Sequence, residues 1–225
     1  MDGAKFLLFL FIFFSTHCSY GVETKKIILT QTHIEQFAKE GKQLNLSWCA
    51  CKAFPEHVRI VFTEQLIHLY SKNYSKNKNL VITFFASGYL FLQEYTILRA
   101  LHCNGFKQIT PYFIDPVFSN KDINKKMSQF KEIVRQYPSI QEPQYFISAE
   151  EYLRDQTASK TDILTTIDIK DPLILEEYQN IREQKMNPQG RSVCTYSTLL
   201  TKIEDARKEQ KLVDIQKAFT TDIDF

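Results

Sequence analysis

The sequence is poor in the residues that interrupt regular structure. Its 225 residues include only 6 glycines and 7 prolines, and it contains no repeat and no low-complexity tract. These shortages exclude a repeat architecture and favour helices and strands joined by short connections. With 44% hydrophobic residues, the chain has enough apolar material for one sizeable core.

An excess of either charge is also missing. The 28 basic and 26 acidic residues are spread along the chain and leave a net charge of +2. This balance excludes the basic footprint that attracts nucleic acid or an anionic membrane. Two catalytic motifs are absent as well, because the sequence has neither a G-x-S-x-G nucleophile elbow nor a Walker phosphate loop. A hydrolase triad on such an elbow and a Walker-type nucleotide site are therefore not indicated.

The one unbroken apolar run near the N-terminus is too short to cross a bilayer. Phe6–Phe14 is nine residues long, follows a lysine and precedes a short polar stretch that ends in Ser19-Tyr20-Gly21. This pattern predicts a signal peptide over residues 1–21 and export of the mature chain to the periplasm or the outside. Processing as a lipoprotein at Cys18 is disfavoured, because the bulky His17 directly precedes it. No later segment is apolar enough to span a membrane.

Few cysteines remain after that cleavage. Cys49, Cys51, Cys103 and Cys194 are an even number, which in an oxidising compartment allows one or two disulfides in any of three pairings. Cys49 and Cys51 are too close in sequence to bridge easily to each other. Together with His57 they lack a fourth metal ligand, so packing or disulfide formation is favoured and no metal is expected.

What the sequence does contain is an alternation of helix and strand patterns. After an N-terminal helical flank over residues 22–55, with a helix at Thr32–Gly41, the region 56–225 forms the main domain. Expected strands are Leu80–Ala86, Gln108–Ile114, Gln144–Ile147, Asp162–Ile169 and Ser192–Tyr196; expected helices are Glu56–Tyr70, Leu90–His102, Asp122–Tyr137, Ala149–Gln156, Pro172–Glu183 and Thr198–Phe219. The alternation predicts an α/β fold, doubly wound and Rossmann-like, with a mostly parallel sheet of five or more strands and helices on both faces.

Ligands of such sheets bind beyond the carboxyl ends of the strands, where the strand order reverses. The polar residues expected at those ends are Ser87 and Gly88, Asp115, Ser148 with Glu150, Asp168, and Tyr196 with Ser197. A glycine lets the backbone approach a ligand, a helix N-terminus offers free N–H groups, and a carboxylate accepts hydrogen bonds from ribose hydroxyls. These features suit a small nucleoside-type ligand.

The order of elements over Glu56–Ser197 resembles that of the class I S-adenosylmethionine-dependent methyltransferases. The resemblance places Ala86-Ser87-Gly88-Tyr89 at the family's glycine-rich loop and Asp115 at its ribose-binding acid. It implies S-adenosylmethionine as the cofactor, held by Ser87, Gly88 and Asp115. The family's loop normally carries two or three glycines, whereas this loop has Gly88 alone.

Acceptor contacts are expected from Glu94 and Tyr196. Two structural alternatives stay open, since Asp115 precedes a proline and is suited to end the strand in an Asx-type turn, and an acid such as Glu94 is favoured at a helix N-terminus without any function. The sequence thus supports either an exported protein that binds an adenosine-containing ligand, with methyl transfer as its activity, or a non-catalytic secreted interaction protein that kept the fold and lost the cofactor. Its protein partner is not indicated.

Overall fold

The structure is a computed structural model that describes residues 29–48, 56–88, 90–169 and 172–196. The predicted signal peptide over residues 1–21, Cys49, Cys51 and the helix expected at Thr198–Phe219 lie outside the described residues. Among the helices of the described ranges, none is both long enough and apolar enough to cross a membrane.

Five parallel strands form one sheet, in the order β3-β2-β1-β4-β5. The strands are β1 (Asn79–Phe85), β2 (Gln108–Ile114), β3 (Gln144–Phe146), β4 (Thr161–Ile169) and β5 (Met186–Tyr196). β1 lies at the centre, and its residues 80–85 are all buried, as a strand covered on both faces requires. The doubly wound, Rossmann-like sheet predicted from the sequence is confirmed.

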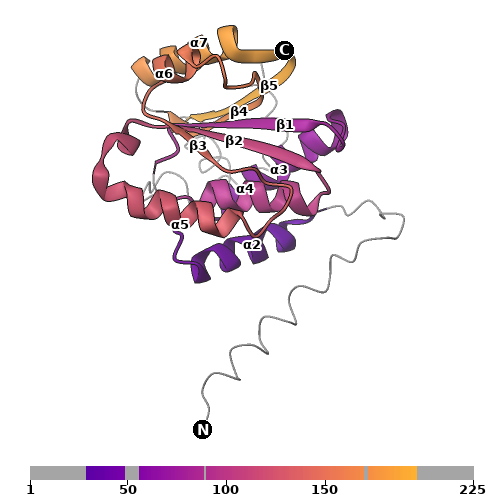
Figure 1. Ribbon diagram of the computed structural model, residues 1–225. Coiled ribbons are helices and arrows are strands. Elements are labelled where there is room, and N and C mark those ends of the chain that lie inside the picture. Colours follow the sequence, from indigo (N-terminus) through magenta and orange to yellow (C-terminus); the bar gives the residue numbers. More distant parts are fainter. Residues whose placement is uncertain (1–28, 49–55, 89, 170–171, 197–225) are drawn as a thin grey trace, which may run out of the picture.

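Helices cover both faces of this sheet (Figure 1). They are α2 (Gln31–Gln43), α3 (Glu56–Asn73), α4 (Leu92–Cys103), α5 (Asn124–Val134), α6 (Ala149–Arg154) and α7 (Pro172–Lys185). The larger core includes side chains of α2, α3, α4 and α5 together with strand residues, and a second core joins the other face to α6 and α7. The strand order reverses between β1 and β4, because β2 and β3 extend the sheet on one side of β1, and β4 and β5 extend it on the other.

Three elements begin two or more residues away from the predicted position. The helix expected from Asp122 is preceded by two short 3-10 turns, η1 (Pro116–Ser119) and η2 (Lys121–Ile123), because the Asn120 side chain accepts a hydrogen bond from Asp122 N and caps the second turn. The helix expected at Leu90 begins at Leu92, since Phe91 has φ +57° and cannot continue an α-helix.

The last strand is the third difference. β5 begins at Met186, six residues earlier than expected, and its pairing with β4 is irregular between Thr161 and Ile163. Pro188 and Gly190 lie within this irregular part, and in sequence they indicate a turn.

The N-terminal flank packs on the helix that follows the first strand. A Cβ placed on Gly41 of α2 would overlap Leu92 of α4 and lie 2.8 Å from Tyr95 Cδ1, so only glycine permits this close approach. Beyond α2, Ser47 N donates to Leu90 O (3.2 Å) and Leu92 N donates to Ser47 O (3.4 Å). The flank therefore holds the loop between β1 and α4 from outside.

Candidate ligand site

The loop that joins β1 to α4 contains three residues in the left-handed region. Ala86 has φ +53°, Gly88 +69° and Phe91 +57°. Glycine adopts this conformation freely, whereas a residue with a side chain loses about 1–2 kcal/mol there. The chain thus makes the sharp turn of a glycine-rich loop with only one glycine.

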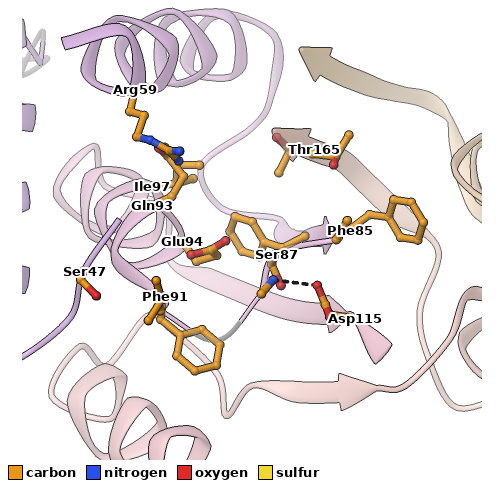
Figure 2. Close-up of a pocket in the computed structure, with 15 residues that line it drawn as sticks. Ser47, Arg59, Phe85, Ser87, Phe91, Gln93, Glu94, Ile97, Asp115 and Thr165 are labelled. Atoms are coloured by element: carbon orange, nitrogen blue, oxygen red, sulfur yellow. Dashed lines mark hydrogen bonds between the residues drawn. The ribbon is translucent and has the colours of Figure 1, made fainter. Parts of the chain in front are cut away.

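Asp115, which directly follows β2, is hydrogen-bonded to this loop. Its Oδ2 accepts a hydrogen bond from Gly88 N at 2.8 Å, drawn as a dashed line in Figure 2. Its Oδ1 accepts one from Val117 N, also at 2.8 Å. The bond to Val117 N is the Asx-type turn that the sequence offered as the structural alternative. Each carboxylate oxygen still has a lone pair for a further donor. The structure therefore brings Ser87, Gly88 and Asp115 together, as predicted, but with the carboxylate already bonded to the loop.

A cavity of about 140 Å³ lies beside this loop, at the point where the strand order reverses. It is lined by polar and charged residues from four parts of the chain, including Arg59, Ser87, Gln93, Glu94, Asp115 and Thr165. In Figure 2, Arg59 comes from α3, Gln93 and Glu94 from α4, and Thr165 from β4. The cavity thus joins the helices on one face to the carboxyl ends of the central strands.

Four buried polar atoms without a hydrogen-bond partner among the described residues belong to residues that line this cavity. They are Ser87 Oγ, Gln93 Oε1, Thr165 Oγ1 and Thr166 Oγ1. A buried polar atom without a partner costs about 1–3 kcal/mol, and folded proteins contain few of them. All four belong to residues around one cavity, which makes this cavity the candidate ligand site.

The orientation of the Gln93 amide follows from its neighbours on α3. Gln93 Nε2 donates to Thr63 Oγ1 (2.7 Å), and Thr63 Oγ1 donates to Arg59 O (2.9 Å). In this arrangement the Thr63 hydroxyl donates its single hydrogen to the Arg59 carbonyl and accepts from Gln93. The amide oxygen is therefore the atom of Gln93 that has no partner.

Glu94 is a buried acid next to this amide, with only 6% of its surface exposed. Burial raises the pKa of its carboxyl to about 7, although the helix backbone and Arg59 lower it; the Asp115 carboxylate raises it further. Arg59 is itself buried and lies over the Trp48 ring at 5.5 Å from the centroid. Near neutral pH Glu94 is therefore poised to take up or release a proton.

Other residues expected at the strand ends lie elsewhere or outside the description. Ser148 caps α6, with its Oγ accepting from Glu151 N (3.1 Å), and Glu150 forms an ion pair with Arg154. Neither lines the cavity, so the expectation that they share the crevice is wrong: β3 is at the edge of the sheet, and two strands separate it from β4. Tyr196 ends β5, but its side chain and those of Asp168 and Ser197 lie outside the description.

The sequence reasoning missed Arg59, Gln93, Thr165 and Thr166. Two signals were present: Arg59 is a charged residue within an apolar helix pattern, and Thr165-Thr166 is a polar pair within an apolar strand. Of the cysteines considered for disulfides, Cys103 accepts a hydrogen bond from Arg99 Nη1 (2.5 Å). The side chains of Cys49, Cys51 and Cys194 lie outside the description.

No protein-family model matches this sequence, and no curated protein sequence matches it. Solved structures do match. The CMeT domain of citrinin polyketide synthase is 12% identical with a TM-score of 0.42, over 62% of this chain and 33% of that chain. A methyltransferase of Podospora anserina bound to S-adenosylhomocysteine is 8% identical with a TM-score of 0.45, over 86% of this chain and 71% of that chain.

A third match is a putative protein-L-isoaspartate O-methyltransferase of Plasmodium falciparum in complex with S-adenosyl-L-homocysteine. It is 10% identical with a TM-score of 0.43, over 74% of this chain and 83% of that chain. The present chain spans only about a third of the length of the polyketide synthase domain.

Proposed function

We propose that this chain binds an adenosine-containing ligand, with S-adenosylmethionine as the first candidate, at the carboxyl ends of β1, β2 and β4. The observation that carries the proposal is that four residues lining one cavity beside Asp115 each have a buried polar atom without a partner among the described residues. A bound polar ligand supplies the partners that these atoms lack. The position at the reversal of strand order is where open α/β sheets bind ligands.

Asp115, Ser87 and Gly88 are the residues proposed to hold the ligand. The Asp115 carboxylate accepts the two ribose hydroxyls, one of them in the place that Gly88 N occupies in this structure. Ser87 Oγ, which is buried without a partner, supplies a further polar contact. Val117 N keeps the carboxylate oriented while the ligand binds.

Entry of a whole nucleoside requires the loop to move. The cavity of about 140 Å³ is smaller than the roughly 300–1,000 Å³ of typical small-molecule sites. The bond between Gly88 N and Asp115 is the contact that must yield, because it draws the loop onto the carboxylate. We therefore expect a nucleoside ligand to replace Gly88 as the donor to Asp115.

Methyl transfer is the reaction proposed for S-adenosylmethionine, whose sulfonium is an activated methyl donor. The protein would mainly position the acceptor. Glu94, with its pKa raised to about 7, is the proposed proton acceptor for the group that is methylated. Tyr196, at the end of β5, is a second proposed acceptor contact.

A second candidate function is that of a non-catalytic interaction protein, which on the prediction of a signal peptide acts outside the cell. The conformation of the loop between β1 and α4 favours this candidate. Both oxygens of Asp115 are bonded to the chain's own backbone, and Ala86 and Phe91 stand at positions where glycine would ease the turn. In this case the fold persists and the cofactor does not bind.

Calorimetric titration of the purified full chain with S-adenosylmethionine, S-adenosylhomocysteine, adenosine and ATP separates the two candidates. The ligand proposal expects saturable binding of the S-adenosyl compounds, weakened by about tenfold or more in Asp115→Asn. Asp122→Asn, on the exposed η2 turn, is the matched control and should bind as the parent does. Absence of binding would favour the interaction protein, and equal affinity in Asp115→Asn would contradict the proposed role of Asp115.

A further inference from the structure

Two hydrogen bonds tie the loop between β1 and α4 to other parts of the chain. In one, the Asp115 carboxylate at the end of β2 accepts from Gly88 N at 2.8 Å. The other is made by residues 44–48 of the N-terminal flank, here called the strap, in which Ser47 N donates to Leu90 O at 3.2 Å. Gly88 and Leu90 are two residues apart in sequence, so a displacement of the loop that breaks one bond also strains the other.

The strap also completes the first turn of α4. Phe91, the residue that precedes this helix, makes no hydrogen bond with its side chain to cap it. Leu92 N instead donates to Ser47 O at 3.4 Å, and Ser47 pairs with Phe91 in an isolated parallel bridge. The first N–H groups of a helix need partners from outside the helix. Release of the strap therefore removes the partner of Leu92 N as well.

The loop has one fixed end and one less buried part. The Phe91 ring is only 1% exposed and stacks on Phe130 of α5, with the ring centroids 4.5 Å apart. Ser87, Gly88 and Leu90 are only partly buried. A segment with less burial opens at a lower cost than the core to which it is joined. The part of the loop that can open is therefore the part that Asp115 and the strap hold.

The strap belongs to the wall of the cavity. Ser47 and Leu90 both line it, together with Ser87 of the same loop, and Figure 2 shows Ser47 on the flank near Phe91. Because these residues are part of the wall, movement of the strap with the loop enlarges the cavity beyond its volume of about 140 Å³.

The strap is attached to the rest of the molecule by a small number of contacts. Leu46 is buried, whereas Asn45 and Ser47 are exposed. The Leu44 carbonyl accepts from Gln129 Nε2 of α5 at 3.1 Å, and the Trp48 ring lies under a guanidinium of α3. The bonds of Ser47, at 3.2 and 3.4 Å, are longer than most N–H···O bonds. Such a segment can separate from the core without unfolding of the sheet.

We propose that the strap gates the cavity: the loop after β1 opens only together with residues 44–48, as one cooperative unit. The flank thereby keeps the cavity small until the unit opens. As a statement about the regulation of ligand entry the inference rests on the proposed function, whereas the coupled opening is a property of the free chain.

Amide hydrogen exchange of the full chain, followed residue by residue by NMR, tests the coupling without any ligand. The amides of Gly88, Ser47 and Leu92 should exchange with one common opening constant, because one event releases all three. This constant should exceed that of Ile82 in β1, which is released only when the sheet unfolds. Opening constants that differ among the three amides by more than about tenfold would overturn the gate.

Two variants test the coupling from its two sides. Leu46→Ala loosens the strap, so exchange at Gly88 should rise by about tenfold or more, whereas Ile181→Ala, a matched truncation in the second core, should change it by less than about threefold. Asp115→Ala frees Gly88 N, so exchange at Ser47 should rise as well. Unchanged exchange at Gly88 in Leu46→Ala, or at Ser47 in Asp115→Ala, would contradict the inference.

Ligand titration distinguishes this inference from the proposed function. Trp48 is the only tryptophan of the chain and belongs to the strap, so its fluorescence follows the strap when S-adenosylmethionine is added. The gate predicts association at least about threefold faster in Leu46→Ala than in the parent, and equal rates would overturn it. Coupled exchange without binding of any S-adenosyl compound supports the gate and contradicts the nucleoside proposal. Binding with uncoupled exchange overturns the gate and leaves the nucleoside proposal standing.

Discussion

At the scale of single residues, Asp115 connects the strand end to the loop above it. Its two oxygens accept from Gly88 N and Val117 N, and the chain has no second glycine in that loop to ease the turn. The carboxylate therefore stabilises a backbone conformation that the loop residues themselves do not favour. The same atoms are the ones proposed to meet a ribose.

Replacing this carboxylate should lower the stability of the ligand-free protein. Asp115→Ala removes two charge-assisted hydrogen bonds, so the free energy of unfolding should fall by about 1.5–3 kcal/mol in urea titrations. Asp122→Ala, on the exposed η2 turn, should change it by less than about 0.5 kcal/mol. If both variants were equally stable, the bond to Gly88 N would not hold the loop.

Two positions of the loop should respond to substitution with opposite signs. Gly88→Ala places a side chain at φ +69° with no heavy atom within 4 Å of its Cβ, so the whole loss of about 1–2 kcal/mol is conformational. Ala86→Gly relieves the same conformation at φ +53° and should leave stability unchanged or raise it by about 1 kcal/mol. Thermal unfolding of both variants measures the contrast, and a loss of stability in Ala86→Gly would contradict it.

At the scale of elements, the contact between α2 and α4 depends on one glycine. A Cβ on Gly41 would overlap Leu92 and approach the Tyr95 ring. In an open helix, glycine to alanine raises stability by about 1 kcal/mol. Here Gly41→Ala should lower it by about 1–3 kcal/mol, because the helices are forced apart.

The control for that substitution lies on the same helix. Lys39 of α2 is exposed, and Lys39→Ala should change the free energy of unfolding by less than about 0.5 kcal/mol. Urea unfolding of the two variants compares a packed with an open position. A gain of stability in Gly41→Ala would mean that α2 does not pack closely on α4.

The sequence predicted an element well where that element's own residues form a clear apolar or boundary pattern. β1 is apolar along its length and is buried from residue 80 to residue 85, and the pattern of α7 begins at the proline that the sequence indicated. β5 was recognised only from Ser192, because Pro188 and Gly190 indicate a turn although pairing with β4 includes Met186. The start of a strand that depends on pairing with a neighbouring strand cannot be predicted from the local sequence pattern.

The residues of the candidate site were likewise predicted only where local sequence places them. Ser87, Gly88 and Asp115 are adjacent to strand ends, and a sheet of parallel strands brings such residues together without further information. Gln93 and Thr63 acquire their roles only from a contact between α3 and α4 across 30 positions of sequence. Local spacing contains no trace of this contact.

At the scale of the whole molecule, two buried titratable groups should shape the pH dependence of stability. Burial raises the pKa of Glu94 to about 7, so the folded state holds an extra proton above pH 4.5 and stability falls as pH rises from about 4.5 through 7. Burial and Arg99 lower the pKa of His102 to about 4, so stability falls as pH drops from 6.5 towards 4. Below pH 6.5 the two slopes oppose each other.

The variant Glu94→Gln should separate the contribution of Glu94 to the pH dependence of stability from that of His102. The variant should match the parent near pH 4.5 and exceed its free energy of unfolding at pH 8 by up to about 3 kcal/mol, because the cost of burying a charged carboxylate is gone. The rise in stability between pH 4 and 6.5, due to His102, should remain in the variant and become steeper than in the parent. Urea titrations across this pH range measure the free energy of unfolding of both proteins. The raised pKa assigned to Glu94 would be contradicted if this free energy changed with pH in the same way in both.

The most direct test of the central claim is the calorimetric titration of the full chain with S-adenosylmethionine, repeated on Asp115→Asn. The claim that the cavity at the ends of β1, β2 and β4 receives an adenosine-containing ligand predicts saturable binding to the parent and an affinity at least about tenfold lower in the variant. Binding that is absent from the parent, or equally tight in both proteins, would contradict it.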